Sequence, residues 1–333
     1  MQARSLPAYS PRREYLMAST NAVTALIVTY NGKSRGFLTD AVESVLVQTL
    51  RPTEILVIDD ASTDGTAQML AARYGGELTV VSLPENLGPS GARNYGLRLA
   101  KSPFVAFLDD DDAWLPTRVQ RELGVLDGSD ANLVFGRAEI IDSRGNTLPG
   151  RSSTYPESLS WPGILFRNPV HGPSCVLARR ETVLAVGGFP EEFRMGEDWI
   201  LWAKIARVAS IRFLDGVVTR YRRHDHQSGV GRSTTWIREQ TLAALQHLVR
   251  DLTPGQAALV INAYASGCAL RAFASLRPRD ALHFATAATG SVNWPSLVQR
   301  ASMVALERTS PRISEVANRT HIRRLVKQFL ELQ

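Results

Sequence analysis

Three stretches of sequence decide the fold: VTALIVTYN at 23–31, EILVIDD at 54–60 and FVAFLDDDD at 104–112. Each contains a predicted strand, over 23–29, 54–58 and 104–108, made of apolar and β-branched residues and followed by polar side chains. This is the pattern of a buried parallel strand. Segments with apolar residues at helical spacing separate these runs. The alternation predicts an α/β fold with a mostly parallel central sheet flanked by helices. In such sheets, ligands bind beyond the carboxyl ends of the strands, where these polar residues lie.

The elements between and after these strands follow the same alternation. Apolar spacing and chain-breaking residues predict helices over 41–50, 65–74, 91–100 and 116–126, and further strands over 78–83 and 133–141. Residues 142–196 are rich in Gly and Pro, which predicts a mixed, loop-rich half that shapes a substrate site. A helix over 197–208 and a strand over 211–221 follow. Helical patterns then continue from 236 to the end, so a boundary is expected near 230.

Composition and charge exclude several classes of protein. The 333 residues are 44% hydrophobic and 21% charged, which is typical of a globular chain. The net charge of +6 is uneven, because residues 226–333 hold 13 Arg and Lys but only 6 Asp and Glu. A uniform nucleic-acid-binding surface is therefore not expected. Two cysteines exclude a disulfide framework and a multi-cysteine metal site. No apolar run reaches the ~18 residues of a spanning helix, so a soluble or peripheral protein is expected.

The four aspartates at 109–112 are the sharpest chemical feature. Four adjacent carboxylates at the end of an apolar strand repel one another, and a divalent cation would relieve that repulsion. Hard oxygen ligands suit Mg²⁺ or Mn²⁺, which are often held by one or two carboxylates together with substrate phosphates. The alternative is a solvated acidic loop whose aspartates cap the following helix.

A second acidic strand end stands at Asp59 and Asp60. A carboxylate in this position can accept a hydrogen bond from a ring N–H of a nucleobase. The alternative is an Asx turn followed by a helix cap, which would account for Ser62 and Asp64 but less well for the two preceding aspartates.

Several motifs in order resemble the family 2 glycosyltransferases, over about residues 22–228. The matching segments are TYN (29–31), VIDDASTDGT (57–66), NLGPSGARN (86–94), FLDDDDAWLP (107–116), GGFPEEF (187–193), EDW (197–199) and YRRH (221–224). The resemblance implies a GT-A fold, a nucleoside-diphosphate-sugar donor of UDP or dTDP type, and inversion at the anomeric carbon. It divides the chain into a flexible segment (1–21), a catalytic domain (22–228, with nucleotide-binding half 22–115 and acceptor half 116–228) and a helical C-terminal extension (229–333).

The resemblance also implies roles for donor-side residues. Tyr30, with Thr29 before it, would flank the base, and Asp60 would accept the base N3–H. Arg93 would meet the base or the diphosphate. The acidic run and a late histidine complete the expected donor site. Asp109 would contact the ribose or a metal ion, and Asp110 would take the variable position beside the nucleotide. Asp111 and His224 would bind a Mn²⁺ or Mg²⁺ ion. His226 stands two residues beyond His224, and a lone loop histidine is otherwise an ordinary surface residue.

Asp198 resembles the catalytic base of that family. Inverting displacement at an acetal carbon needs a carboxylate that takes the proton of the acceptor hydroxyl. Asp198 opens the expected helix over 197–208, where the helix dipole would keep the carboxylate ionised at neutral pH. The alternative is that Glu197 and Asp198 only complement that dipole. Glu197, His171 and Trp199 are weaker acceptor-side candidates, and Trp199 and Trp202 fit the core equally well.

The C-terminal stretch 321–332 is predicted to be a basic amphipathic helix. It could lie on an anionic membrane surface, or pack its apolar face on the domain and leave its basic face in solvent. The resemblance implies a glycan or lipid-linked glycan acceptor, a cytoplasmic location that includes the inner face of the plasma membrane, and a role in bacterial cell-surface polysaccharide synthesis. The competing hypothesis is a non-catalytic nucleotide- or glycan-binding scaffold. A P-loop and a dinucleotide-binding glycine motif are both absent from the sequence.

Overall fold

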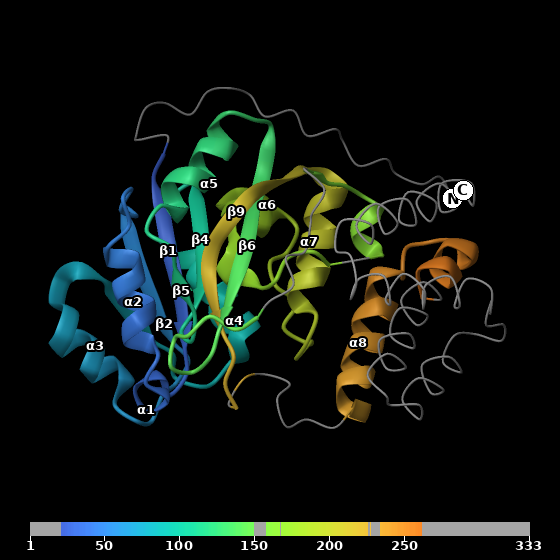
Figure 1. Ribbon diagram of the computed structural model, residues 1–333. Coiled ribbons are helices and arrows are strands. Elements are labelled where there is room, and N and C mark those ends of the chain that lie inside the picture. The colour runs from blue at the N-terminus through green and yellow to red at the C-terminus, as the bar shows by residue number, and fades with distance from the viewer. Residues whose placement is uncertain (1–20, 150–157, 167, 226, 228–233, 262–333) are drawn as a thin grey trace.

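The computed structural model describes residues 21–149, 158–166, 168–225, 227 and 234–261. This part of the chain forms one curled sheet of nine strands in the order β3-β2-β1-β4-β8-β6-β9-β5, with β7 paired to β9. Figure 1 shows helices on both sides of the sheet. The predicted α/β fold is confirmed. The segment expected at 1–21 and the basic helix expected at 321–332 lie outside the described residues, apart from Asn21.

The first four strands pair in parallel, as the sequence predicts. They are β1 (Val23–Thr29), β2 (Glu54–Asp59), β3 (Thr79–Ser82) and β4 (Phe104–Asp109). In the register of the sheet, Thr29 lies opposite Asp59, and Val28 lies opposite Asp109. The polar ends of β1, β2 and β4 therefore meet at one edge, as expected for parallel strands.

Both faces of this sheet are buried because side chains alternate between two cores. In β1, Leu26 packs into one core while Ala25 and Ile27 pack into the other. Helices α4 (Gly88–Leu99) and α7 (Glu197–Val208) contribute to the first core. The second core is covered by α2 (Leu38–Leu46), α3 (Thr66–Tyr74) and α5 (Arg118–Asp127). The short helix α1 (Gly32–Arg35) follows β1 directly.

The second half of the sheet is mixed. Its strands are β5 (Ala113–Trp114), β6 (Ala131–Ile141), β7 (Ser158–Leu159), β8 (Val176–Arg179) and β9 (Ser210–Arg222). Strand β8 runs antiparallel between β4 and β6, whereas β6 and β9 are parallel. The sequence predicts β6, β9 and α7, but β8 and α6 (Arg180–Ala185) fall in the stretch expected to be loop-rich.

A buried arginine ties β4 to β8 at the centre of the sheet. Nη1 of Arg118 donates to the carbonyl of Phe107 at 3.2 Å, and Nη2 donates to the carbonyl of Val176 at 2.7 Å. Its Nε donates to Glu122 at 2.8 Å, and the guanidinium stacks 4.1 Å from the ring of Trp114. Burial raises the pKa of Glu122 to about 7, against the lowering effect of Arg118. These contacts fix β4, whose carboxyl end carries the acidic run.

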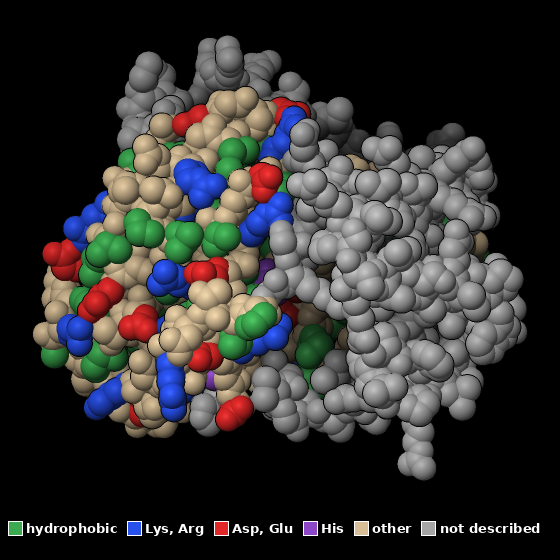
Figure 2. Space-filling view, viewed as in Figure 1, with side chains coloured by type: hydrophobic (Ala, Val, Ile, Leu, Met, Phe, Trp, Pro, Cys, Tyr) green, Lys and Arg blue, Asp and Glu red, His purple; other side chains and the backbone are tan. Residues whose placement is uncertain are grey.

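The start of the C-terminal region packs on the sheet domain. Helix α8 (Thr234–Leu248) lies beside α7 (Figure 1). Leu245, Val249 and Val260 belong to the same core as Trp202 of α7. Among the described helices, none is long and apolar enough to cross a membrane. Over the described part of the face in Figure 2, basic and acidic side chains are interspersed.

Candidate active site

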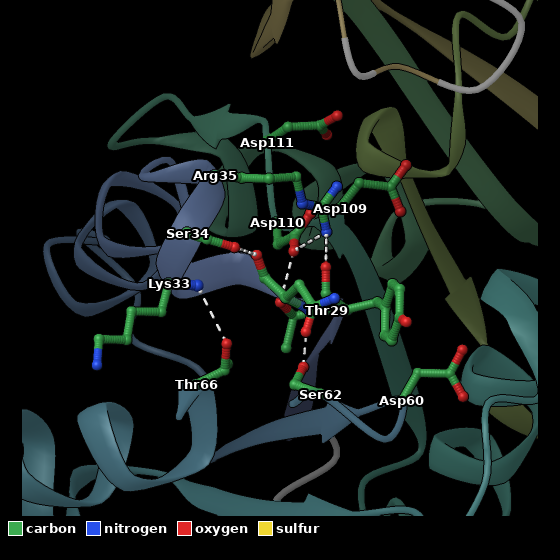
Figure 3. Close-up of polar contacts among 12 residues, drawn as sticks. Thr29, Lys33, Ser34, Arg35, Asp60, Ser62, Thr66, Asp109, Asp110 and Asp111 are labelled. Atoms are coloured by element: carbon green, nitrogen blue, oxygen red, sulfur yellow. Dashed lines mark hydrogen bonds and ion pairs between the residues drawn. The ribbon is translucent and has the colours of Figure 1, made fainter. Parts of the chain in front are cut away.

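The loops after β1 and β2 are bound to each other at the edge of the sheet where the strands end (Figure 3). Asn31 adopts a left-handed backbone conformation, its N–H donates to Oγ of Ser62 at 2.8 Å, and its Oδ1 accepts the N–H of Thr63 at 2.9 Å. Asp64 accepts the N–H and hydroxyl of Ser34 and the N–H and hydroxyl of Thr66. Although burial opposes it, these hydrogen bonds lower the pKa of Asp64 to about 2. Asp64 forms the expected turn by accepting the N–H of Thr66, but the expected helix cap is wrong, because Gly65 is the N-cap of α3 and no side chain caps that helix.

The four aspartates at 109–112 alternate in their environment. Asp110 and Asp112 are 5% and 1% exposed, whereas Asp109 and Asp111 are half-buried. The N–H of Asp112 donates to the carbonyl of Asp109 at 3.1 Å, so the run turns back immediately after β4. Within this turn, buried and half-buried carboxylates therefore alternate.

Asp110 is held inside the protein. Its Oδ2 accepts the hydroxyl of Thr29 at 2.5 Å and pairs with Nη2 of Arg35 at 2.6 Å (Figure 3). Arg35 also donates to the carbonyl of Tyr30 at 2.6 Å. Burial raises the pKa of Asp110 to about 7, and Arg35 opposes the rise. The expected contacts of Asp110 and Thr29 with a nucleotide stay predictions, and in this structure the polar atoms of the two side chains bind each other. Tyr30 is 44% exposed and remains available at the rim.

Asp112 is also a structural residue. Its Oδ1 accepts the N–H of Arg222 at 3.0 Å, and its Oδ2 has no hydrogen-bond partner among the described residues. Burial raises the pKa of Asp112 well above its ordinary value, and the neighbouring carboxylates Asp111 and Asp109 add to the rise. The N–H of Arg222 opposes this rise.

Asp60 joins the end of β2 to the start of α4. Its Oδ1 accepts the N–H of Leu87 at 2.7 Å, and its carbonyl accepts Nδ2 of Asn86 at 3.0 Å. Burial raises the pKa of Asp60, and the backbone N–H groups of Leu87 and Gly88 oppose the rise. Nη1 of Arg194 lies close to the backbone of Gly88, only 2.9 Å from where a Cβ would stand. The expected contact of Asp60 with a base stays a prediction.

Arg93 is buried between the end of β4 and the start of α7. Its Nη2 lies 2.6 Å from Oδ1 of Asp109, and its Nη1 lies 3.5 Å from Oε1 of Glu197. Its guanidinium also stacks 5.2 Å from the ring of Phe189. The sequence-based expectation was a contact between Arg93 and the base or diphosphate. The structure instead pairs its guanidinium with two carboxylates from different parts of the chain.

Asp111 and His224 meet at a distance of 2.9 Å between Oδ2 and Nε2. Within the described ranges, no group of three or more His, Cys, Asp or Glu side chains is arranged to hold a metal ion. A carboxylate oxygen and an imidazole nitrogen this close can still ligate one divalent ion, provided that phosphate and water oxygens fill the remaining positions. The donor set therefore fits an ion held jointly by protein and substrate. His226 lies outside the described residues.

Asp198 is the second residue of α7 and is half-buried. Its Oδ1 accepts the N–H of Trp199 at 2.7 Å. Burial and the neighbouring Glu197 raise the pKa of Asp198 to about 7, while Trp199 N–H and Arg93 oppose the rise. The expectation that the helix dipole keeps this carboxylate fully ionised at neutral pH is wrong, because burial and Glu197 outweigh the dipole.

The acceptor-side candidates lie in different surroundings. Trp199 and Trp202 are both buried in the core, and Nε1 of Trp199 donates to the carbonyl of Ile164 at 2.8 Å, so an acceptor contact by Trp199 is not supported. Glu197 faces Arg93, as described above. His171 is exposed and packs edge-on against Tyr221, with ring centroids 4.6 Å apart.

Four residues that organise the site were missed at the sequence level: Arg35, Asn94, Ser174 and Arg222. Ser174 accepts the N–H of Asp109 at 3.0 Å. Asn94 donates to the carbonyl of Phe189 at 2.7 Å and accepts its N–H at 2.8 Å. Asn94 lies in the GARN segment and Arg222 in the YRRH segment, so the motif matches pointed to both positions without giving their roles.

Solved structures resemble the chain over most of its length. S. aureus TarS (residues 1–349) in complex with UDP-GlcNAc gives a TM-score of 0.60 at 20% identity, covering 94% of this chain and 92% of that one. A mannosyltransferase from Pyrobaculum calidifontis, in complex with GDP-Man and Mn²⁺, gives a TM-score of 0.55 at 19% identity, covering 92% and 85%. At these identities the likeness shows the fold. The protein has the GT-A fold of nucleotide-sugar glycosyltransferases.

The sequence comparisons name the family. Residues 24–186 match the family model for glycosyl transferase family 2, and this segment of the chain is a member of that family. An uncharacterized glycosyltransferase of Rickettsia conorii is 30% identical over 212 residues, covering 62% of this chain and 34% of the relative. The chain thus spans about a third of the length of that relative. The succinoglycan biosynthesis protein ExoO of Rhizobium meliloti is 30% identical over 192 residues, covering 54% of each.

Proposed function

We propose that the protein transfers a sugar from a nucleoside-diphosphate sugar, of UDP or dTDP type, to a hydroxyl of a glycan or lipid-linked glycan, with inversion at the anomeric carbon. One observation carries the proposal. Arg93 joins Asp109, at the end of β4, to Glu197, which precedes Asp198 at the start of α7. One buried guanidinium therefore pairs with a carboxylate at the end of β4 and with the residue next to the candidate base.

The acceptor step needs a carboxylate that can take a proton. In the proposed mechanism, a carboxylate oxygen of Asp198 takes the proton from the acceptor hydroxyl as the hydroxyl oxygen bonds to the anomeric carbon. The bond from that carbon to the diphosphate oxygen breaks on the opposite face, and the nucleoside diphosphate leaves with the electron pair. A base works best when its pKa lies near the operating pH, and the pKa of about 7 for Asp198 fits that requirement.

The donor-side residues would bind and orient the nucleotide. Asp60 would accept a ring N–H of the base, and the exposed ring of Tyr30 would pack beside it. Asp109, whose Oδ1 is held by Arg93, would face the ribose. Asp111 and His224 would hold a Mn²⁺ or Mg²⁺ ion, whose charge would stabilise the departing diphosphate.

The names of the relatives support a role in bacterial surface polysaccharide synthesis. One relative is the E. coli UDP-Glc:alpha-D-GlcNAc-diphosphoundecaprenol beta-1,3-glucosyltransferase WfgD, which is 28% identical over 185 residues, covering 56% of this chain and 70% of the relative. We propose an acceptor of the same chemical class, a glycan on a lipid diphosphate. Such an acceptor would place the enzyme in the cytoplasm at the inner face of the plasma membrane. We also propose that the basic helix expected at 321–332 contacts the membrane surface.

A donor panel tests the proposal. Purified protein with Mn²⁺ is screened against UDP-, dTDP-, GDP- and CMP-sugars by thermal shift, because a ligand that binds only the folded state raises its apparent stability. Hits are then assayed for release of the nucleoside diphosphate. One UDP- or dTDP-sugar should both stabilise the protein and be turned over, with loss of turnover in EDTA. Tight nucleotide binding that EDTA leaves unchanged, without turnover of any donor, would favour the scaffold hypothesis.

A further inference from the structure

Arg222 is a buried arginine at the last position of β9, two residues before His224. Its side chain and backbone bind three acidic residues. Nε donates to the carbonyl of Asp111 at 2.9 Å, the N–H donates to Oδ1 of Asp112 at 3.0 Å, and Nη2 pairs with Oδ2 of Asp40 at 2.9 Å. Arg222 is only 3% exposed, so its own donor atoms in these contacts are shielded from solvent. One residue therefore fixes the acidic turn after β4 to the start of α2.

An aromatic ring extends this arrangement to His224. The guanidinium of Arg222 lies 4.7 Å from the ring centroid of Phe37, and the ring of Phe37 lies 4.9 Å from that of His224. His224 in turn meets Asp111 at 2.9 Å. The contacts close a ring: Arg222 to the backbone of Asp111, Asp111 to His224, His224 to Phe37, and Phe37 back to Arg222. The four residues are therefore linked by direct contacts.

We propose that Arg222 is a positioning residue that sets the distance between Asp111 and His224, and thereby the affinity of this pair for a divalent cation and the diphosphate it accompanies. The inference rests on the proposed function, because it assigns Asp111 and His224 to cation binding. Arg222 does not touch the donor. It acts through the backbone carbonyl of Asp111 and through the ring of Phe37, which contacts His224. Changes to residues that orient metal ligands typically lower metal affinity by about 10- to 100-fold.

The fork of the guanidinium is central to this role. In the variant Arg222→Lys, the ammonium group would keep a positive charge for Asp40 but would offer no Nε–H to the carbonyl of Asp111 and no planar group for Phe37. This variant is therefore expected to fold and yet bind the cation poorly. Arg222→Met keeps a long side chain but removes every hydrogen bond that the Arg222 side chain makes. Arg220→Met is the matched control, because Arg220 lies on the same strand and pairs with Glu139 at 3.1 Å in an exposed position.

A double-mutant cycle separates positioning from general stability. Mn²⁺ binding in the presence of UDP is measured by calorimetry or electron paramagnetic resonance for wild type, Arg222→Lys, Arg222→Met, His224→Ala, the Arg222→Met/His224→Ala double variant and Arg220→Met. Each variant is first checked for folding by circular dichroism. Arg222→Lys and Arg222→Met should weaken Mn²⁺ binding by about tenfold or more, and Arg220→Met by less than about twofold. In the His224→Ala background, Arg222→Met should add less than about twofold.

Two results would overturn the inference: unchanged Mn²⁺ affinity in a folded Arg222→Lys protein, or fully additive effects in the cycle. Nitrogen-15 NMR of the His224 ring is recorded in the ligand-free protein. This measurement reports the surroundings of His224 without any bound cation or nucleotide, so it does not depend on the proposed function. The ring signals should shift in Arg222→Lys and stay in place in Arg220→Met. If wild type binds no Mn²⁺ with any nucleotide, the proposed function fails. In that case the NMR comparison tests only whether Arg222 positions the ring of His224. Unchanged ring signals in Arg222→Lys would reject that role.

Discussion

The guanidinium of Arg93 and the carboxylate of Asp109 are 2.6 Å apart, although one residue lies on α4 and the other ends β4. The same guanidinium reaches Glu197 of α7, 104 positions away along the chain. This bridge connects the half of the domain that would bind the nucleotide to the helix that carries Asp198. The residue expected to contact the donor thus joins the two halves of the site.

Removal of Arg93 should leave two carboxylates facing each other without a cation. Arg93→Met is expected to lower the free energy of unfolding by about 3 kcal/mol, because breaking a buried ion pair by removing one partner typically costs that much. Urea unfolding measures the change. The control is Arg73→Met, which breaks the exposed pair with Glu43 and should cost less than about 1 kcal/mol. Equal losses of unfolding free energy in the two variants would show that the buried Arg93 pairs stabilise the fold no more than an exposed ion pair does.

The two glycines before Phe189 offer a matched pair of substitutions. Gly187 and Gly188 both have positive φ, +90° and +69°. A Cβ at Gly188 would stand 2.4 Å from Oδ1 of Asn94, whereas a Cβ at Gly187 meets nothing within 4 Å. Gly187→Ala should cost about 1 kcal/mol for its left-handed backbone alone. Gly188→Ala should cost clearly more and should also disturb Asn94. Thermal unfolding of both variants checks this, and a smaller loss for Gly188→Ala would contradict the packing described.

The parallel half of the fold was predictable from the sequence, and the antiparallel insertion was not. The prediction for β1 matches the structure residue for residue, and those for β2 and β4 fall one residue short, because β-branched apolar runs between polar ends carry a strong local signal. Strand β8 has four residues and follows a loop rich in Gly and Pro, so it has no such signal. Its place between β4 and β6 depends on long-range contacts such as those of Arg118.

The site was predictable as a set of residues but not as a set of contacts. The strand ends placed Asp60 and the acidic run at one edge correctly. Four identical aspartates, however, give no sign of which ones turn inward, and the turn from Asp109 to Asp112 decides this in the folded chain. The pKa of Asp198 likewise depends on its burial and on Glu197, which local sequence cannot reveal.

Asp60 should govern recognition of the base. Asp60→Asn is expected to weaken UDP binding by about tenfold or more, because a hydrogen bond to a charged acceptor is worth roughly 1.5–3 kcal/mol. Isothermal titration with UDP measures the loss. Asp64→Asn serves as control, since Asp64 holds the adjacent turn and faces Ser34 and Thr66 instead. If the two variants bind UDP alike, the role of Asp60 in reading the base is wrong.

The pH dependence of the rate follows from the raised pKa of Asp198. A general base acts in its deprotonated form, so kcat/KM should rise with pH through about 7 and level off above it. The rate is measured as release of nucleoside diphosphate between pH 5 and 9. A rate that is flat from pH 5 upward would mean that the base is ionised throughout and that burial does not raise its pKa.

The same shift predicts a stability difference with a definite sign. The folded-state pKa of Asp198 lies above its unfolded value, so its contribution to stability is present below about pH 4 and is lost as the pH rises through about 7. Asp198→Asn stays neutral throughout. The melting temperature of Asp198→Asn relative to wild type should therefore be higher at pH 8 than at pH 5. The opposite order would indicate a stabilising, ionised Asp198.

The most direct test of the central claim compares wild type with Asp198→Asn on the donor and acceptor identified by the panel. Turnover and UDP affinity are measured on the same preparations. We expect transfer to fall by about 10²-fold or more while UDP affinity changes by less than about threefold, because a general base contributes to the chemical step and not to nucleotide binding. Wild-type turnover in a folded Asp198→Asn protein would contradict the assignment of Asp198 as the base and the mechanism built on it.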